Sequence, residues 1–328
     1  MKAAVLHTLG KPPRCEEFPE PVPGENEALV HVRAAALKPV DKQMASGSHY
    51  ASPRQLPAVC GVDGVGRLES GSRVFFGGPR RPYGALAERT VAPRAWCWPL
   101  PDEVDDVTAA ALVNPGMSAW LTLSLRAQLA PGQSVLILGA TGVTGKLAVQ
   151  IAKLLGARRV VGAGRNEQAL AVLPSLGADR TIRLDQPAEA LAEAFAHEAG
   201  AREARDGGRT GFDVIIDYLW GPPTEALLSA FTRADWKASS RTRLVQVGES
   251  AGSAIVLPAA ALRSSGLEIV GAGSGSIPPR DVLMDAYRQL MDRASRGELR
   301  VETERVPLAE IEDAWQREAQ RRRLVVIP

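Results

Sequence analysis

Cysteine is scarce in this chain of 328 residues, which contains only Cys15, Cys60 and Cys97. These cysteines are odd in number and far apart, and they form no CxxC pair, which argues against a disulfide framework and indicates a reducing compartment. Long apolar runs are also missing. No stretch approaches the ~20 apolar residues that cross a bilayer, and the apolar run at residues 1–6 is too short for a signal peptide. We therefore expect a cytoplasmic protein with no membrane partner.

An excess of charge of one sign is also absent, since the formal net charge is only +2. No basic stripe carries interleaved aromatic residues, so we expect no nucleic-acid partner. Histidine is rare, and the four histidines are scattered without the spacing of metal ligands. What the chain does have is 45% apolar residues and a length that suits two domains with a sizeable core.

The first hundred residues favour a domain rich in strands and loops. Short apolar or alternating runs separated by turn formers predict strands at residues 3–6, 28–33 and 73–76. The alanine-rich segment 106–112 predicts the start of a helix. A second helix is expected after Pro115-Gly116.

From residue 131 onward, strand and helix patterns alternate. Such alternation over about 140 residues predicts a parallel sheet with helices on both faces. Predicted strands lie at 134–138, 159–161, 213–217, 244–247 and 267–270, and predicted helices at 146–155, 167–176 and 281–294. In the tail we expect a helix at 308–323, with a solvated basic end at 321–323, and then a strand at 324–327.

A glycine-rich turn gives the strongest functional signal. The turn follows a predicted strand and opens a predicted helix, the setting in which such a motif is specific for a dinucleotide. Glycines allow the backbone to approach a pyrophosphate, and the free N–H groups of the helix start bind the anion. The expected cofactor-binding residues are Gly139, Ala140, Thr141, Gly142, Val143, Thr144 and Gly145.

The end of the next predicted strand bears on the choice of cofactor. Sites for NAD usually place an Asp or Glu there, on the ribose hydroxyls. This chain has Gly164, Arg165 and Asn166 instead, and the planar Arg165 cation suits a 2′-phosphate. The sequence therefore favours NADP(H).

Several further motifs follow one another in a characteristic order. The chain resembles the medium-chain dehydrogenase/reductase superfamily, in particular its zinc-free quinone-oxidoreductase branch. The motifs are AALKPVD at 35–41, GVDGVG at 61–66, NPGMSAW at 114–120, the stretch 139–157, LGAD at 176–179 and VQVG at 245–248.

This resemblance implies an α/β fold in which a doubly wound Rossmann domain is inserted in a GroES-like, β-rich catalytic domain. The expected division is 1–112 and 274–328 for the catalytic domain and 113–273 for the NADP-binding domain. Members usually form homodimers or homotetramers by joining Rossmann sheets at their edges, here at the strand around 267–271. The resemblance also places Asn114, Ser118, Val247 and Gly248 near the cofactor.

Zinc-dependent relatives use a Cys and a Gly-His-Glu motif, and this chain holds Lys38 and Gly61-Val62-Asp63 in those places. Because valine cannot ligate zinc, and because no cluster of four cysteines is present, we expect no metal. Many quinone reductases have Asn where Lys38 stands. The Lys and Tyr that often hold the 2′-phosphate are replaced by Ala169 and Leu184.

The expected activity is metal-free reduction of a quinone or an α,β-unsaturated carbonyl by hydride transfer from NADPH. Hydrogen-bond donors must then polarise the acceptor, and Lys38 and Tyr50 are the candidate catalytic residues. For Lys38 the alternative is an ion pair with Asp41, and for Tyr50 a packing role.

Two other classes of function stay open. An atypical short-chain reductase shares the glycine turn but carries it near the N-terminus, and no Tyr here has a Lys four residues later. A non-catalytic redox sensor that binds NADPH is compatible with Lys38 in place of Asn. Which acceptor is reduced is not encoded in a recognisable motif.

Overall fold

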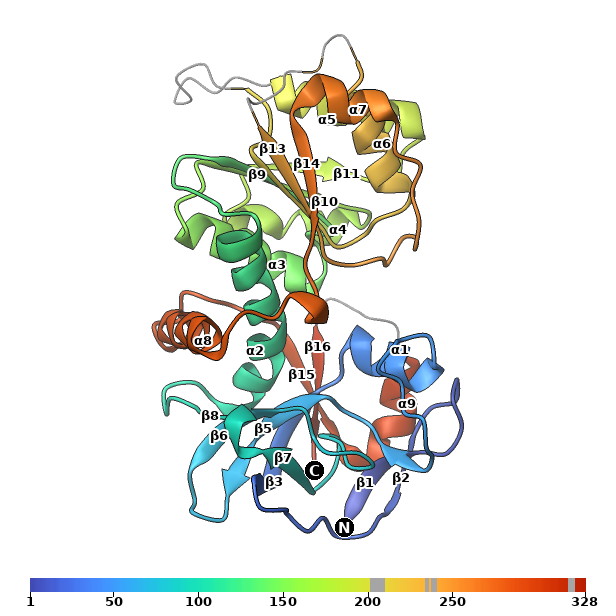
Figure 1. The fold of residues 1–328 in the computed structure, drawn as a ribbon, viewed down its shortest axis with the longest axis vertical. Helices are drawn as coiled ribbons and strands as arrows, with labels where there is room; N and C mark the ends of the chain where they lie inside the picture. Colours follow the sequence, from blue (N-terminus) through green and yellow to red (C-terminus); the bar gives the residue numbers. More distant parts are fainter. Residues whose placement is uncertain (201–209, 234–235, 237–240, 318–321) are drawn as a thin grey trace. The chain divides into compact units, whose positions relative to one another are not determined.

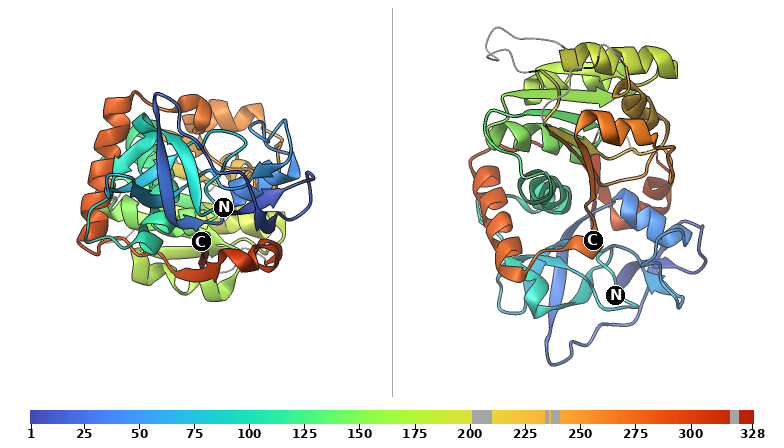
Figure 2. Two further views of the ribbon diagram at one scale, coloured as in Figure 1. Left: turned by 90° about the horizontal axis from the view of Figure 1, so that it is seen from below. Right: turned by 45° about the horizontal axis from the view of Figure 1, so that its top comes forward.

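The structure is a computed structural model of the chain. It describes residues 1–200, 210–233, 236, 241–317 and 322–328. The chain divides into two compact units: unit 1 comprises Met1–Pro115 and Gln289–Pro328, and unit 2 comprises Gly116–Arg288. Both chain ends therefore belong to unit 1, and Figure 2 marks them. The domain boundaries predicted after residues 112 and 273 stay predictions.

Six strands form the central sheet of unit 2 (Figure 1): β9 (Ser134–Leu138), β10 (Arg159–Gly164), β11 (Arg180–Arg183), β12 (Val214–Asp217), β13 (Thr242–Gln246) and β14 (Leu267–Gly271). Every neighbouring pair is parallel, in the order β11-β10-β9-β12-β13-β14. All five residues of β9 are buried, as a strand covered on both faces requires. This order is that of a Rossmann fold, and the expected edge strand β14 is confirmed.

Helices pack on both faces of this sheet (Figure 1): α3 (Val143–Leu154), α4 (Glu167–Leu170), α5 (Ala188–Gly200), α6 (Pro222–Ala230) and α7 (Ala259–Ser265). Side chains of α5, α6 and α7 join those of the strands in one apolar core, in which Leu136, Phe195 and Leu227 are at most 1% exposed. Burying each such side chain contributes roughly 1.5–3 kcal/mol. This packing fixes the strand ends that carry the glycine turn.

Unit 1 is rich in β structure: β1 (Lys2–Leu6), β2 (Arg14–Glu17), β3 (Glu27–Ala36), β4 (Ala58–Val59), β5 (Asp63–Leu68), β6 (Arg73–Gly77), β7 (Arg89–Pro93), β8 (Cys97–Pro99), β15 (Thr303–Pro307) and β16 (Arg323–Ile327). One sheet has the order β2-β1-β4, and the larger one has the order β15-β16-β3-β5-β6-β8 with β7 on β3. Because β16 pairs with β3, the end of the chain completes a sheet begun by its first part.

Two short helices lie within unit 1, α1 (Pro39–Ser46) and α9 (Ile311–Gln316), and two longer helices, α2 (Asp106–Leu121) and α8 (Arg280–Ser295), contain the unit boundaries. The sequence explains both ends of α1. Pro39 suits the first helical position, and the Asp41 carboxylate accepts the Lys38 N–H at 2.8 Å. Gly47, at φ +84°, then ends the helix. Among the described residues no helix is both long and apolar enough to cross a membrane.

A single helix, α2, replaces the two helices predicted around Pro115. A proline inside a helix removes one hydrogen bond. Here the helix is buried over most of its circumference, with Ala109, Leu112 and Ala119 fully enclosed, and this burial offsets the loss. The prediction of a break was wrong because tertiary packing overrides the local preference.

Two predicted helices are shorter than expected. Segment 167–176 forms α4 and a separate 3-10 turn at Leu173–Leu176. In the tail, α9 ends at Gln316, and residue 321 lies outside the described residues. The predicted solvated basic end was wrong at Arg323, which starts β16, is 8% exposed and donates to the Leu37 carbonyl at 3.0 Å.

Candidate active site

The predicted glycine turn connects β9 to α3 in unit 2. Gly139 has φ +83°, a conformation that favours glycine, and its N–H and that of Ala140 both donate to the Ala163 carbonyl of β10. Gly142 is exposed and caps α3 with an extended backbone. The first N–H groups of α3 have no acceptor within the helix, so the turn offers donors for an anion.

Close packing explains two of the glycines at this turn. A Cβ atom at Gly145 would lie 2.2 Å from the Gly139 carbonyl oxygen, and a Cβ at Gly164 would lie 2.4 Å from the Thr141 side chain. A Cβ at Gly142 would meet the same Gly139 oxygen at an ordinary 3.5 Å. Gly145 and Gly164 are thus required by packing, whereas Gly142 has room for a side chain on its exposed side.

Arg165 and Asn166 follow directly after β10, next to the turn. The Asn166 side chain caps α4 by accepting the Ala169 N–H at 2.9 Å, so its carbonyl group is already engaged. Arg165 is exposed, and within the described part of the chain its guanidinium has no hydrogen bond or ion pair. Ala169 and Leu184, in the places where the resemblance expects a Lys and a Tyr, are buried.

A carboxylate that the sequence did not single out shapes the end of β12. The Asp217 side chain is fully buried and accepts the N–H groups of Leu219 and Trp220 and the Thr224 hydroxyl, at 2.8, 2.9 and 2.6 Å. Burial raises the pKa of this carboxyl, against the effect of those donors. The signal available in the sequence was an Asp at the carboxyl end of a parallel strand, where ligands of such sheets bind.

The predicted residues Val247 and Gly248 lie beside this loop. Their N–H groups donate to the Asp217 backbone carbonyl at 2.8 and 3.2 Å. On the other side, a Cβ at Gly139 would lie 3.1 Å from the Leu219 side chain. The structure therefore brings the ends of β9, β12 and β13 together. The contact of Val247 and Gly248 with the cofactor stays a prediction.

In unit 1, Lys38 lies in a buried cluster of charges and is 3% exposed. Its ammonium donates to the Ala36 carbonyl at 2.9 Å and to Asp63 Oδ1 at 3.0 Å, and it lies 3.6 Å from Asp41 Oδ2. Burial raises the pKa of the Asp41 carboxyl, while the Lys38 ammonium acts in the opposite direction. The ion pair weighed for Lys38 is thus present, and the nearer carboxylate is that of Asp63.

Asn114 joins the same cluster from α2. Its side-chain Nδ2 donates to Asp63 Oδ2 at 2.7 Å, although Asn114 as a whole is exposed. Ser118, one helical turn further along, is half-buried and belongs to unit 2. The sequence predicted a place for Asn114 near the cofactor but did not identify Asp63 as its partner.

Tyr50 lies apart from this cluster. It follows α1, its side chain is 78% exposed, and its ring centroid is 4.1 Å from that of His49. A phenol in this position is accessible from solvent. Its exposure contrasts with that of Lys38, which is 3% exposed.

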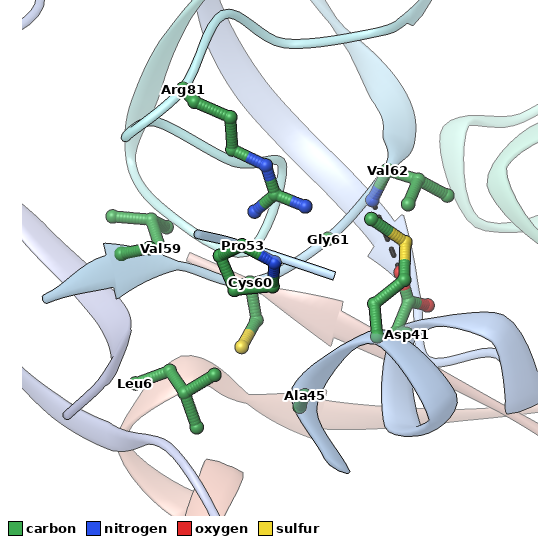
Figure 3. A pocket seen from close by; sticks show the side chains of 11 residues that line it. Leu6, Asp41, Ala45, Pro53, Val59, Cys60, Gly61, Val62 and Arg81 are labelled. Atoms are coloured by element: carbon green, nitrogen blue, oxygen red, sulfur yellow. Dashed lines mark hydrogen bonds between the residues drawn. The ribbon is translucent and has the colours of Figure 1, made fainter. Parts of the chain in front are cut away.

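A pocket opens in unit 1 next to α1 (Figure 3). Its lining includes Asp41, Met44, Cys60, Val62 and Arg81. Figure 3 shows the Arg81 guanidinium directed toward the pocket and the Val62 N–H joined to Asp41, at 3.1 Å. Burial raises the pKa of the Cys60 thiol to about 12, so the thiol stays protonated and weakly nucleophilic at neutral pH.

The described residues contain no group of three or more His, Cys, Asp or Glu side chains placed to hold a metal ion. The places that carry zinc ligands in metal-dependent relatives hold Lys38 and Val62, neither of which suits zinc here. The absence of a metal stays a prediction. The ammonium of Lys38 is the cation found beside Asp63.

Comparison with known proteins gives concordant matches. Residues 143–295 match the family model described as zinc-binding dehydrogenase. The protein named "Probable NADPH-dependent quinone reductase tdiC", from Emericella nidulans, is 26% identical over 100% of both chains. The trans-enoyl reductase tndF of Aspergillus flavipes is 35% identical over 47% of this chain and 52% of its own.

Among solved structures, the quinone oxidoreductase of Thermus thermophilus, which was also crystallised with NADPH, is 28% identical. The similarity covers 100% of both chains with a TM-score of 0.81. The structure comparison therefore agrees with the fold of the chain. The chain belongs to the medium-chain dehydrogenase/reductase superfamily, in its quinone-oxidoreductase-like branch.

Proposed function

We propose that this protein reduces quinones or α,β-unsaturated carbonyl compounds with NADPH and without a metal. The observation that carries the proposal is the glycine turn between β9 and α3, with Arg165 beside it at the end of β10. An exposed Gly142 and a guanidinium with no partner among the described residues fit a dinucleotide that ends in a 2′-phosphate. The names of the relatives support the same class of reaction.

Each predicted cofactor residue has a proposed role. Residues 139–145 form the turn that holds the pyrophosphate, through the first N–H groups of α3 at Val143, Thr144 and Gly145, since those of Gly139 and Ala140 already donate to the Ala163 carbonyl. Arg165 pairs with the 2′-phosphate. Gly164 keeps the ribose path free of side chains, and Asn166 holds the start of α4 in place. The nicotinamide end is assigned to Asn114, Ser118, Val247 and Gly248.

Bound NADPH supplies the hydride, and this chain supplies binding, orientation and polarisation of the acceptor. Tyr50 is the proposed donor to the substrate oxygen, since its hydroxyl is on an exposed side chain. Lys38 was also predicted as a direct donor. Its burial, at 3% exposed, and its contacts with Asp63 and the Ala36 carbonyl favour a positioning role instead, because the ammonium is enclosed and already held by two acceptors.

The proposal is tested by following NADPH oxidation with a panel of quinones and enones, with NADH and EDTA as controls. We expect turnover that is selective for NADPH and insensitive to EDTA, and the best acceptor then names the substrate class. NADPH binding without turnover of any acceptor would instead indicate a redox sensor. Alcohol oxidation abolished by EDTA would refute the metal-free mechanism.

A further inference from the structure

Four buried charged side chains are gathered in unit 1 close to Asn114. They are Lys38, Asp41, Asp63 and Arg323, all at most 8% exposed, and their formal charges cancel. Two of them have local tasks: the Asp41 carboxylate accepts the N–H groups of Lys38 and Val62, and Arg323 donates to a backbone carbonyl. Lys38 also donates to the Ala36 carbonyl, whereas the Asp63 carboxylate accepts from side-chain donors.

Asp63 has both carboxylate oxygens occupied by side-chain donors. Oδ1 accepts from the Lys38 ammonium at 3.0 Å, and Oδ2 accepts from Asn114 Nδ2 at 2.7 Å. An ionised carboxylate can only accept hydrogen bonds. The Asn114 amide must therefore turn its NH₂ group toward Asp63, which leaves its Oδ1 as the group available to a ligand.

We propose that the buried Lys38–Asp63 ion pair fixes the orientation of the Asn114 amide, so that Asn114 Oδ1 accepts a hydrogen bond from an N–H or O–H donor at the nicotinamide end of the cofactor. Lys38 and Asp63 are then positioning residues that act through Asn114. This inference rests on the proposed function, because it requires a bound nicotinamide cofactor.

Stability alone is a weak reason to keep this pair. Taking two charges out of water costs several kcal/mol per ion, and neutral replacements of both partners are often as stable or more stable. Removing one partner is costly, because it leaves the other charge buried and uncompensated. These two effects make it possible to separate a structural role from a positioning role.

The experiment compares Lys38→Met, Asp63→Asn and the double variant K38M/D63N. Two quantities are measured for each: the Kd for NADPH by fluorescence titration and the midpoint of thermal unfolding. We expect both single variants to lose stability and the double variant to recover much of it. In the double variant the amide introduced at position 63 both donates and accepts, so it no longer dictates the orientation of Asn114, and NADPH should bind about 3- to 10-fold more weakly.

Recovery of wild-type NADPH affinity together with stability in the double variant would overturn the proposal. A second measurement tests the route: adding Asn114→Ala to the double variant should weaken NADPH binding no further, and additive losses would contradict the proposed path. If a single variant does not fold, the double and triple variants still decide. Absence of NADPH binding by the wild-type protein would instead refute the proposed function.

A matched control removes an ion pair at the start of α2, the helix that carries Asn114. Arg73 contacts Asp106 at 2.7 Å in the first turn of that helix, away from Asn114. The double variant R73M/D106N should bind NADPH as the wild type does. A loss of affinity there equal to that of K38M/D63N would show that any disturbance of α2 is sufficient, and would overturn the specific role of Lys38 and Asp63.

Discussion

Arg165 is the residue on which the cofactor preference depends. Its guanidinium has no partner within the described residues and stands at the end of β10, where a ribose phosphate is expected. Hydrogen bonds to charged groups contribute about 1.5–3 kcal/mol. Arg165→Gln should therefore raise the Kd for NADPH roughly 10- to 100-fold and leave the Kd for NADH unchanged, both measured by fluorescence titration.

Arg183 provides the control for that substitution. It is a half-exposed arginine on β11, and its guanidinium is held by Asp185 at 2.8 Å, so it is not free to hold a phosphate. Arg183→Gln should leave both dissociation constants unchanged. If the Arg165→Gln variant bound NADPH with the same Kd as the wild-type protein, the argument for NADP(H) preference would be refuted.

For single residues, the sequence predicted a contact between near neighbours but not the contacts that depend on the fold. The ion pair between Lys38 and Asp41 was foreseeable because the two are three residues apart at a helix start. The closer partner, Asp63, lies 25 residues away and reaches Lys38 only because β3 and β5 pair. Likewise, Asp217 ends an apolar run that the sequence shows, but its donors are brought to it only by the fold: two N–H groups of the following loop and the Thr224 hydroxyl of α6.

At the scale of elements, the turn between β9 and α3 offers a test that separates packing from ligand contact. Gly145→Ala would place Cβ 2.2 Å from the Gly139 oxygen, so it should lower the free energy of unfolding by about 1–3 kcal/mol. Gly142→Ala meets only an ordinary contact at 3.5 Å, and its backbone conformation suits any residue. That variant should keep its stability but bind NADPH more weakly, because the new methyl group would occupy the side that the pyrophosphate approaches.

Thermal unfolding and NADPH titration of the two variants provide the measurements, and each variant is the control for the other. Unchanged NADPH affinity in a stable Gly142→Ala variant would mean that the exposed side of this turn does not face the cofactor. Unchanged stability of Gly145→Ala would mean that α3 can move away from β9 at little cost. Either result would require a different account of the turn.

The sequence patterns predicted some helices and strands better than others. β9 and β12 were predictable because each is a short apolar run buried on both faces. β11 was not predicted, because it has only one buried residue, Ile182. The ends of helices were harder to predict. Pro115, for example, lies inside α2 because the helix is enclosed by packing. The tail predicted as one long helix instead forms α9 and β16, since β16 gains strand partners on both sides, β15 and β3.

On the scale of the whole molecule, the first and last parts of the chain together build one unit, and the other unit is continuous in sequence. The two units have separate apolar cores, one including Phe76 and Val326 and the other including Phe195 and Leu227. Stability need not be uniform across such a chain, and each core can open as its own cooperative unit. A substitution near the C-terminus should then destabilise strands near the N-terminus, which share its apolar core, rather than the segments that precede it in the sequence.

Hydrogen exchange with two reciprocal variants tests this independence. Val326, on β16, is 1% exposed, and Ile137, on β9, is fully buried. A buried charge without a partner costs several kcal/mol. Val326→Asp should therefore speed exchange of backbone amides in β3 and β15 while β9 and β10 stay protected, and Ile137→Asp should do the reverse. Faster exchange throughout the chain in both variants would show that the two units unfold together. A substitution in unit 1 could then weaken NADPH binding merely by destabilising the glycine turn. If instead each variant speeds exchange only within its own unit, a change of NADPH affinity in Lys38 or Asp63 variants reports on the site itself.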